Sequence, residues 1–308
     1  MQPLLWDHRP TGLRAPAMVC AFQGWNDAGD AASTAVSFVA SALGARRFAQ
    51  IDMEEFYDFQ ANRPRIRFSS EEADSPSARR EIEWPTVEMH EATIPEGRRD
   101  LVLVQGVEPS LRWRTFSTLV VELAEALGVE LVITLGALLA DVPHTRPVTM
   151  TGFSSDPALM ERMGATSRPS RYEGPTGIVG VLHTATSDAG LPSLSVWASV
   201  PHYVAAAPSP KAALALVRRL EDLVGMTVDA QELEEATASY ERQVGLAVSS
   251  NPEVQAFVER LEQDAESEEE EGDGRGGWSG ISPDDLPSGE LLASEFQRFL
   301  RQHRSENP

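Results

Sequence analysis

The chain has 308 residues, 42% of them hydrophobic, a net charge of −21 at pH 7 and a single cysteine, Cys20. This length can bury a large core in one or two domains, and the acidic balance argues against nucleic acid or an anionic membrane surface as a partner. One cysteine allows no internal disulfide, which favours a cytoplasmic location. The longest apolar run, at 131–140, is too short to span a bilayer, and the first residues lack a signal-peptide pattern, so we expect a soluble protein.

The chain up to Gly225 alternates between strand and helix signals. Residues 17–22 form an apolar run typical of a buried strand, and residues 31–43 repeat apolar side chains at helical spacing. Residues 47–52 and 56–59 are also β-like. This beginning predicts a strand, a helix and a return to the sheet.

The segment at 63–94 alternates apolar and polar residues in period two. Such alternation is typical of half-exposed antiparallel strands. A second buried strand is predicted at 100–107, followed by a helix at 115–128 that Gly128 closes as a C-cap.

Further apolar runs predict a third buried strand at 130–136 and two more at 176–185 and 191–200. Residues 209–225 then form a strongly periodic helix. Buried apolar strands separated by amphipathic helices indicate an α/β fold with a mainly parallel sheet flanked by helices. Residues 1–225 are therefore predicted to form one α/β core domain.

The character of the chain changes after residue 225. Two helical patterns at 226–263 predict an αα-hairpin docked on the core, a C-terminal helical extension. Residues 264–288 are acidic and glycine-rich, which is typical of a solvated flexible linker. Residues 289–303 predict a short terminal helix.

The loop "QGWNDAGDAAS" at 23–33 lies where a strand should turn into a helix. It matches no glycine-rich phosphate motif, it contains no basic residue, and Asp27 and Asp30 would repel an anion. Both aspartates are typical of a helix start, with Asp27 as N-cap and Asp30 favouring the helix dipole. We interpret the loop as a capped strand-to-helix turn.

Val-Pro-His follows an apolar strand twice, in "DVPHTRP" and in "SVPHYV". In a parallel sheet both histidines would lie near the carboxyl ends of strands, where α/β proteins keep their crevice. Asp141, His144, Arg146 and His202 therefore form a candidate pocket with side chains suited to acid–base or anion-binding chemistry. Ordinary turns and pocket lining are the alternative.

A candidate interface follows the strand at 100–107. Glu108, Arg112 and Trp113 combine polar and aromatic character, which suits a protein contact as well as an ordinary helix start. Trp25 in the first loop is the other residue that we expect to face a partner or a neighbouring subunit. The sequence contains no nucleophile elbow and no zinc or redox motif, so it predicts no catalytic residues, metal or cofactor.

Six stretches, in this order and spacing, resemble the proteasome assembly chaperone 2 family, and its uncharacterised actinobacterial branch most closely. They are "AFQGWNDAGDAAS", "LVLVQGVEPSLRW", "LVITLGALLADVPHTRPV", "YEGPTGIVGVLH", "LPSLSVWASVPHYVAAAPSPKAALALVRRLE" and "NPEVQAFVERLE". The resemblance covers about residues 1–265. It implies a fold similar to purine nucleoside phosphorylases, a homo-oligomer such as a trimer, and proteasome subunits as partners. Some members dock through a hydrophobic-tyrosine tail, a pattern from which the final "RQHRSENP" departs.

Two functional hypotheses remain open. The first is a non-enzymatic, oligomeric, chaperone-like module that binds protein. The alternative is a nucleoside-phosphorylase-like enzyme or small-molecule binder, whose pocket would be lined by Asp141, His144, Arg146 and His202. The alternative requires these four side chains to converge on one concave site.

Overall fold

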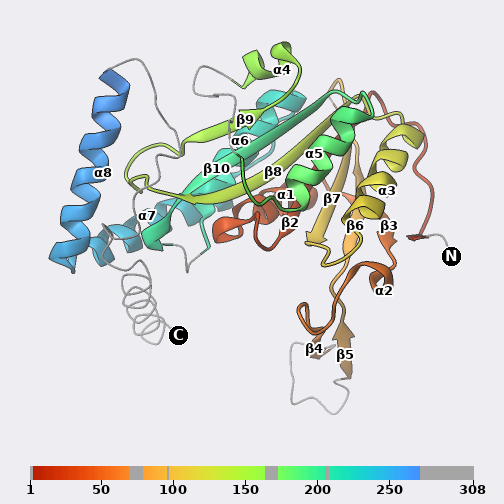
Figure 1. Cartoon of the computed structure of the whole chain (residues 1–308), viewed down its shortest axis with the longest axis horizontal. Helices are drawn as coiled ribbons and strands as arrows, with labels where there is room; N and C mark the ends of the chain where they lie inside the picture. The colour runs from red at the N-terminus through yellow and green to blue at the C-terminus, as the bar shows by residue number, and fades with distance from the viewer. Residues whose placement is uncertain (1–2, 69–78, 96, 164–172, 205–207, 271–308) are drawn as a thin grey trace.

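The structure of the chain is a computed structural model, and it describes residues 3–68, 79–95, 97–163, 173–204 and 208–270 (Figure 1). The terminal helix predicted at 289–303 and most of the predicted linker lie outside these ranges. Within them, no helix combines the length and the apolar character that crossing a membrane would require.

Eight strands form one mixed sheet in the order β1-β3-β6-β7-β2-β8-β10-β9. The strands of this sheet are β1 (Leu4–Trp6), β2 (Ala17–Gln23), β3 (Arg46–Ile51), β6 (Val87–Ala92), β7 (Leu101–Val107), β8 (Leu131–Ala140), β9 (Met150–Phe153) and β10 (Ser193–Pro201). The four central strands β7, β2, β8 and β10 are parallel, whereas antiparallel pairs extend the sheet on both sides. The α/β class predicted from the sequence is confirmed.

Helices cover both faces of this sheet (Figure 1). The helices are α1 (Ala31–Ala42), α2 (Met53–Phe56), α3 (Trp113–Ala126), α4 (Pro157–Arg162), α5 (Ile178–Asp188), α6 (Pro210–Val224), α7 (Gln231–Ser249) and α8 (Pro252–Glu270), with 3-10 turns at Ala28–Asp30 (η1) and His202–Val204 (η2). Helices α1 and α6 pack on one face and α3 and α5 on the other.

Strand β2 shows why the central strands are apolar throughout. Its odd-numbered residues, such as Val19, face the α1–α6 layer, and its even-numbered residues, such as Met18 and Phe22, face the α3–α5 layer. Both sets are fully buried. Cys20 lies among them, and burial raises the pKa of its thiol, so it acts as a core residue.

The prediction of a strand at 176–185 is wrong, because these residues form most of α5. Its buried side chains Ile178, Val179, Leu182 and Thr186 recur at helical spacing. A short apolar run is compatible with either a strand or a helix, and its place over one face of the sheet decides for the helix. Residues 56–59 likewise form no strand, since Phe56 ends the short helix α2.

The period-two segment at 63–94 divides into two parts. Strand β6 joins the main sheet, whereas β4 (Arg65–Phe68) and β5 (Arg80–Glu83) pair only with each other in an antiparallel ribbon. We call these two strands the β-arm. The β-arm projects from the body of the molecule, at the bottom of Figure 1.

Helices α7 and α8 follow the core, as the sequence predicts for 226–263. Helix α8 continues to Glu270, so the first residues of the predicted linker are helical. The pair packs around a small apolar cluster of its own, in which Tyr203 and Val204 of η2 meet Tyr240, Val244 and Phe257. The division of the chain into separate domains stays a prediction.

Candidate functional site

The parallel strands β7, β2, β8 and β10 end at one edge of the sheet, which we call the carboxyl edge. Open α/β sheets bind their ligands at this edge. The loop after β2, the turn after β7, the loop after β8 and turn η2 after β10 all begin here. The candidate pocket and the candidate interface predicted from the sequence both lie in these four segments.

A polar network joins two of these segments, the loop after β2 and the turn after β7, to β8 and to the start of α5. One carboxylate oxygen of Glu108 accepts hydrogen bonds from the side-chain amide of Asn26 at 2.6 Å and from the backbone N–H of Ile178 at 2.8 Å. Asn26 is buried, and its backbone carbonyl oxygen accepts from the backbone N–H of Ala137 in β8 at 2.8 Å. A Cβ atom on Gly177 would lie 2.2 Å from the Asn26 side chain, so glycine permits this close packing. The chain's own side chains therefore occupy the carboxyl edge between β2, β7 and the start of α5.

Glu108 also accepts a hydrogen bond from a backbone N–H group at the start of α5. The first N–H groups of a helix have no partner within the helix and carry partial positive charge. Residue Gly177 occupies the N-cap position and has no side chain to accept from them. The carboxylate of Glu108 takes the place that a bound phosphate would occupy at such a helix N-terminus.

Asp27 caps α1 from a short distance upstream. Its carboxylate accepts from the backbone N–H of Ala32 at 2.7 Å and of Ser33 at 3.3 Å. Burial raises the pKa of Asp27, although these hydrogen bonds act in the opposite direction. Asp30 directly precedes α1 in a left-handed conformation with φ of 50° and makes no side-chain capping bond.

The four candidate interface residues differ in exposure. Trp25 is 64% exposed, the largest value among them. Arg112 forms an exposed ion pair with Glu55. Trp113 opens α3, is half-buried and donates its indole N–H to the carbonyl oxygen of Pro109. Glu108 is bound to Asn26 and Ile178, and Trp113 is half-buried. Among the four residues, Trp25 is therefore the one with a large exposed apolar side chain.

The four candidate pocket residues do not converge on one point. Nδ1 of His202 lies 2.7 Å from a carboxylate oxygen of Asp141, an ion pair once the imidazole is protonated. His144 instead contacts Tyr203, whose hydroxyl accepts its backbone N–H at 2.7 Å and lies 2.9 Å from Nδ1. Burial is the main cause that lowers the pKa of His144, and Lys211 adds to it.

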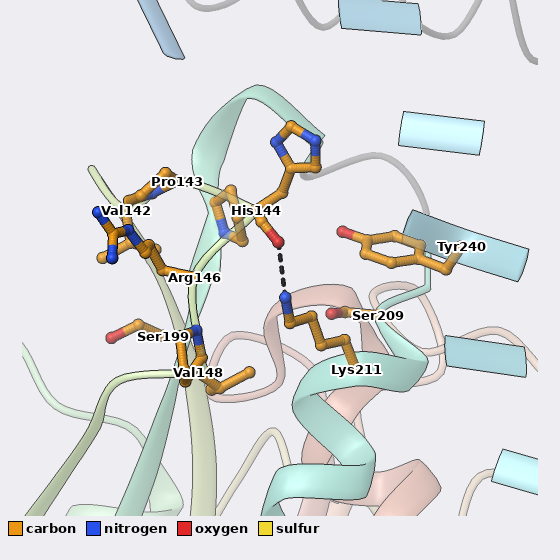
Figure 2. Close-up of a pocket in the computed structure, with 11 residues that line it drawn as sticks. Val142, Pro143, His144, Arg146, Val148, Ser199, Ser209, Lys211 and Tyr240 are labelled. Carbon is orange, nitrogen blue, oxygen red and sulfur yellow. Dashed lines mark hydrogen bonds between the residues drawn. The ribbon is translucent and has the colours of Figure 1, made fainter. Parts of the chain in front are cut away.

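A small cavity lies between the loop after β8 and the start of α6 (Figure 2). Its volume of about 20 Å³ holds one water molecule. Lys211 donates to the backbone carbonyl oxygen of His144 at 2.6 Å, whereas the imidazole ring points away from Lys211 (Figure 2). Lys211 also pairs with Glu241 of α7 at 2.7 Å. Small-molecule sites have volumes of roughly 300–1,000 Å³, so this cavity suits no nucleoside.

The loop after β8 contacts α8 through two polar side chains. Arg146 pairs with Glu266, and Thr145 donates to Glu262, both on α8. Phe257 packs edge-to-face on Tyr203 and His202, with ring centroids 6.1 and 5.5 Å away. The candidate pocket is thus occupied by structural contacts that attach the C-terminal hairpin.

The contacts at the carboxyl edge include residues that the sequence did not mark as candidate site residues. They are Asn26, Tyr203, Tyr240, Glu241 and Phe257. They come from distant elements, and no spacing along the chain connects them. Lys211 carried the one available signal, since it is the only lysine of the chain. Among the described residues, no group of three or more histidine, cysteine or acidic side chains is arranged to hold a metal ion.

Comparisons with known proteins identify the family of this chain. Residues 21–248 match the model of the PAC2 family. The chain is similar to the solved structure of a PAC2 family protein from Streptomyces avermitilis, with 48% identity and a TM-score of 0.70 over 79% of this chain and 99% of that one. A proteasome-assembly chaperone homologue from Mycobacterium tuberculosis is 42% identical, with the same TM-score of 0.70 and the same coverage of 79% and 99%.

An archaeal proteasome activator from Pyrococcus furiosus shares 17% identity and a TM-score of 0.62 over 78% of this chain and 96% of that one, a likeness of fold alone. A search of curated proteins found no significant match. The family match spans most of the chain, and the resemblance noted from the sequence is confirmed. The chain belongs to the PAC2 family.

Proposed function

We propose that this chain is a non-enzymatic, oligomeric protein-binding module with a chaperone-like role, and that it contacts proteasome subunits through the carboxyl edge of its sheet. The observation that carries the proposal is the Glu108–Asn26 network at this edge, close in the chain to the exposed Trp25. The chain's own groups occupy the position where an α/β enzyme would hold a ligand.

Glu108 supports the non-enzymatic part of the proposal. Its carboxylate accepts from the N-terminus of α5 and from Asn26, so a substrate phosphate would meet a negative charge instead of free N–H groups. The cavity beside His144 adds only about 20 Å³. The cavity that His144 and Arg146 line is therefore too small for the substrate of the nucleoside-phosphorylase-like alternative.

Exposed apolar side chains support a protein contact at the same edge. Trp25, Leu111 and Leu139 are 64%, 47% and 49% exposed, and they lie after β2, after β7 and at the end of β8. These three strands are neighbours in the sheet. Clustered exposed apolar residues mark interaction sites, and tryptophan is the residue type that contributes most often to binding energy.

The names of the relatives suggest the class of partner. The 42% identical relative is described as a proteasome-assembly chaperone homologue. Proteasome subunits are therefore the first partner to test, and the buried, lone Cys20 is consistent with action in the reducing cytoplasm.

The test is direct binding of the purified chain to recombinant proteasome α-subunits of Mycobacterium tuberculosis, measured by interferometry. We expect binding that Trp25→Ser weakens about tenfold or more without lowering the melting temperature. Leu246→Ser, a change of a 65% exposed residue on α7, is the matched control and should bind like the wild type. Absence of binding, together with a rise of melting temperature in nucleoside and phosphate, would favour the enzyme alternative.

A further inference from the structure

One face of the β-arm is apolar and exposed. The antiparallel register places Ile66 opposite Ile82 and Phe68 opposite Arg80. Side chains two positions apart share a face, so these four residues lie together. Ile66, Phe68 and Ile82 are 55%, 48% and 58% exposed, and Arg80 is the single charge among them.

The opposite face of the β-arm is suited to water. Arg65 pairs in register with Glu83, and Arg67 with Glu81, and an ion pair joins Arg67 to Glu83. A two-stranded ribbon is marginally stable alone in water. At the base of the ribbon, Trp84 packs edge-to-face on Phe59 at 4.9 Å. Covering the apolar face with another surface would therefore stabilise the β-arm.

The same chain carries a groove of complementary chemistry. It has a volume of about 400 Å³ and lies between the end of α1 and the start of α7. Phe38 and Ala42 supply apolar lining, and Asp229, Glu232 and Glu235 supply negative charge. The carboxylates can pair with Arg80 of the β-arm, and Phe38 and Ala42 offer an apolar strip to its three apolar side chains.

The groove and the β-arm lie at opposite edges of the sheet. The β-arm leads into β6, whose first residue, Val87, pairs with Gly106 near the carboxyl end of β7. Helix α1 starts after β2 at this edge and runs back, so that Ala42 lies near the opposite edge, where β3 begins. The β-arm therefore contacts such a groove only on a second copy.

We infer that the β-arm of one copy binds the α1–α7 groove of a neighbouring copy, in a head-to-tail contact. Contacts of this kind join different patches of two identical chains, and they form a ring when the rotation between copies closes and an open filament when it does not. The inference deepens the oligomeric part of the proposed function. It concerns self-association, so its failure is distinguishable from loss of proteasome-subunit binding.

The first test is the mass of the full chain as a function of concentration, by analytical ultracentrifugation. We expect an oligomer whose dissociation constant rises at least about tenfold in Ile82→Ser, a change of an exposed residue. Arg80→Glu and Glu232→Arg should each weaken the oligomer, and the two changes combined should restore it to within about threefold of the wild type. Leu246→Ser and Trp25→Ser should leave the mass unchanged.

The second test is disulfide trapping, which is feasible because Cys20 is buried. A mixture of Ile82→Cys chains and Ala42→Cys chains should form linked dimers on mild oxidation, whereas each variant alone should not. A wild type that is monomeric at all concentrations would overturn the inference. An oligomer indifferent to Ile82→Ser and Arg80→Glu would overturn it equally.

Discussion

A carboxylate oxygen of Glu108 lies 2.8 Å from the backbone nitrogen of Ile178, the first residue of α5. This contact joins the turn after β7 to a helix that starts seventy positions later in the chain. It replaces the side-chain cap that Gly177 cannot supply, and it places a carboxyl group where an anionic ligand would bind.

Glu108→Ala should lower the free energy of unfolding by about 1–3 kcal/mol, because it leaves a helix N–H and the Asn26 amide without their acceptor. Glu108→Gln keeps an acceptor oxygen and should cost less. Urea denaturation of the three proteins measures the difference. Equal stability of the alanine variant and the wild type would contradict the capping role.

The pair of Asp100 and Arg14 should contribute stability that acid removes. Asp100 accepts from the Arg14 backbone at 2.8 Å, from its guanidinium at 2.7 Å and from the N–H of Ile94 at 3.2 Å. Burial alone would raise the pKa of Asp100, but these hydrogen bonds lower it below its usual value. A lowered carboxyl pKa contributes stability at pH values above about 3.9, and this stability is lost as pH falls further.

Asp100→Asn should therefore destabilise the chain at pH 7 by roughly 1–3 kcal/mol, since the charged hydrogen bonds are lost. The deficit should shrink below about pH 4, where the wild type loses its own advantage. Chemical denaturation at pH 7 and pH 3.5 measures both values. A deficit that is the same at the two pH values would contradict this role.

His183 should make the chain sensitive to mild acid. It is 5% exposed on α5, packs edge-to-face on Phe153 at 5.2 Å, and its ring nitrogens have no hydrogen-bond partner within the described structure. Burial lowers its pKa. Because the unfolded chain then binds a proton that the folded chain does not, stability falls as pH drops below about 6.5.

His183→Leu removes the group that takes up a proton on unfolding, together with two buried polar atoms. The variant should therefore equal or exceed the wild type in stability at pH 7. Its advantage should grow between pH 7 and pH 5. Melting curves over this range provide the measurement, with the wild type at each pH as the reference. A constant difference across the range would show that His183 does not titrate on unfolding.

Phe257→Ala should release α8 without unfolding the core. Its ring packs on His202 and Tyr203 in the apolar cluster that joins α7 and α8 to η2, separate from the two clusters of the sheet. The lost packing should cost about 3 kcal/mol or more locally. Hydrogen exchange should accelerate throughout α8 and remain slow in β2 and β7. Uniform acceleration in sheet and helix would instead show that the hairpin and the core unfold together.

Several elements follow from local sequence. Strand β2 is apolar on both faces because helices cover both, and α6 shows helical spacing with Ser209 as N-cap and Gly225 as C-cap. Asp27 was recognisable as a capping residue because its partners, Ala32 and Ser33, lie only five and six positions further along the chain. Such features depend on neighbours in the chain, so their signal is contained in a short window.

The sequence by itself therefore determined the α/β class, the apolar central strands and most helix boundaries, because each is set by hydrophobic spacing and capping over a few residues. Tertiary structure alone decided that residues 178–188 are a helix, that Glu108 caps it, and that Thr145 and Arg146 in the loop after β8 contact α8. These outcomes depend on contacts between residues seventy or more positions apart, such as Ile178 with Glu108 and Arg146 with Glu266, and a local pattern holds no information about which distant groups will meet.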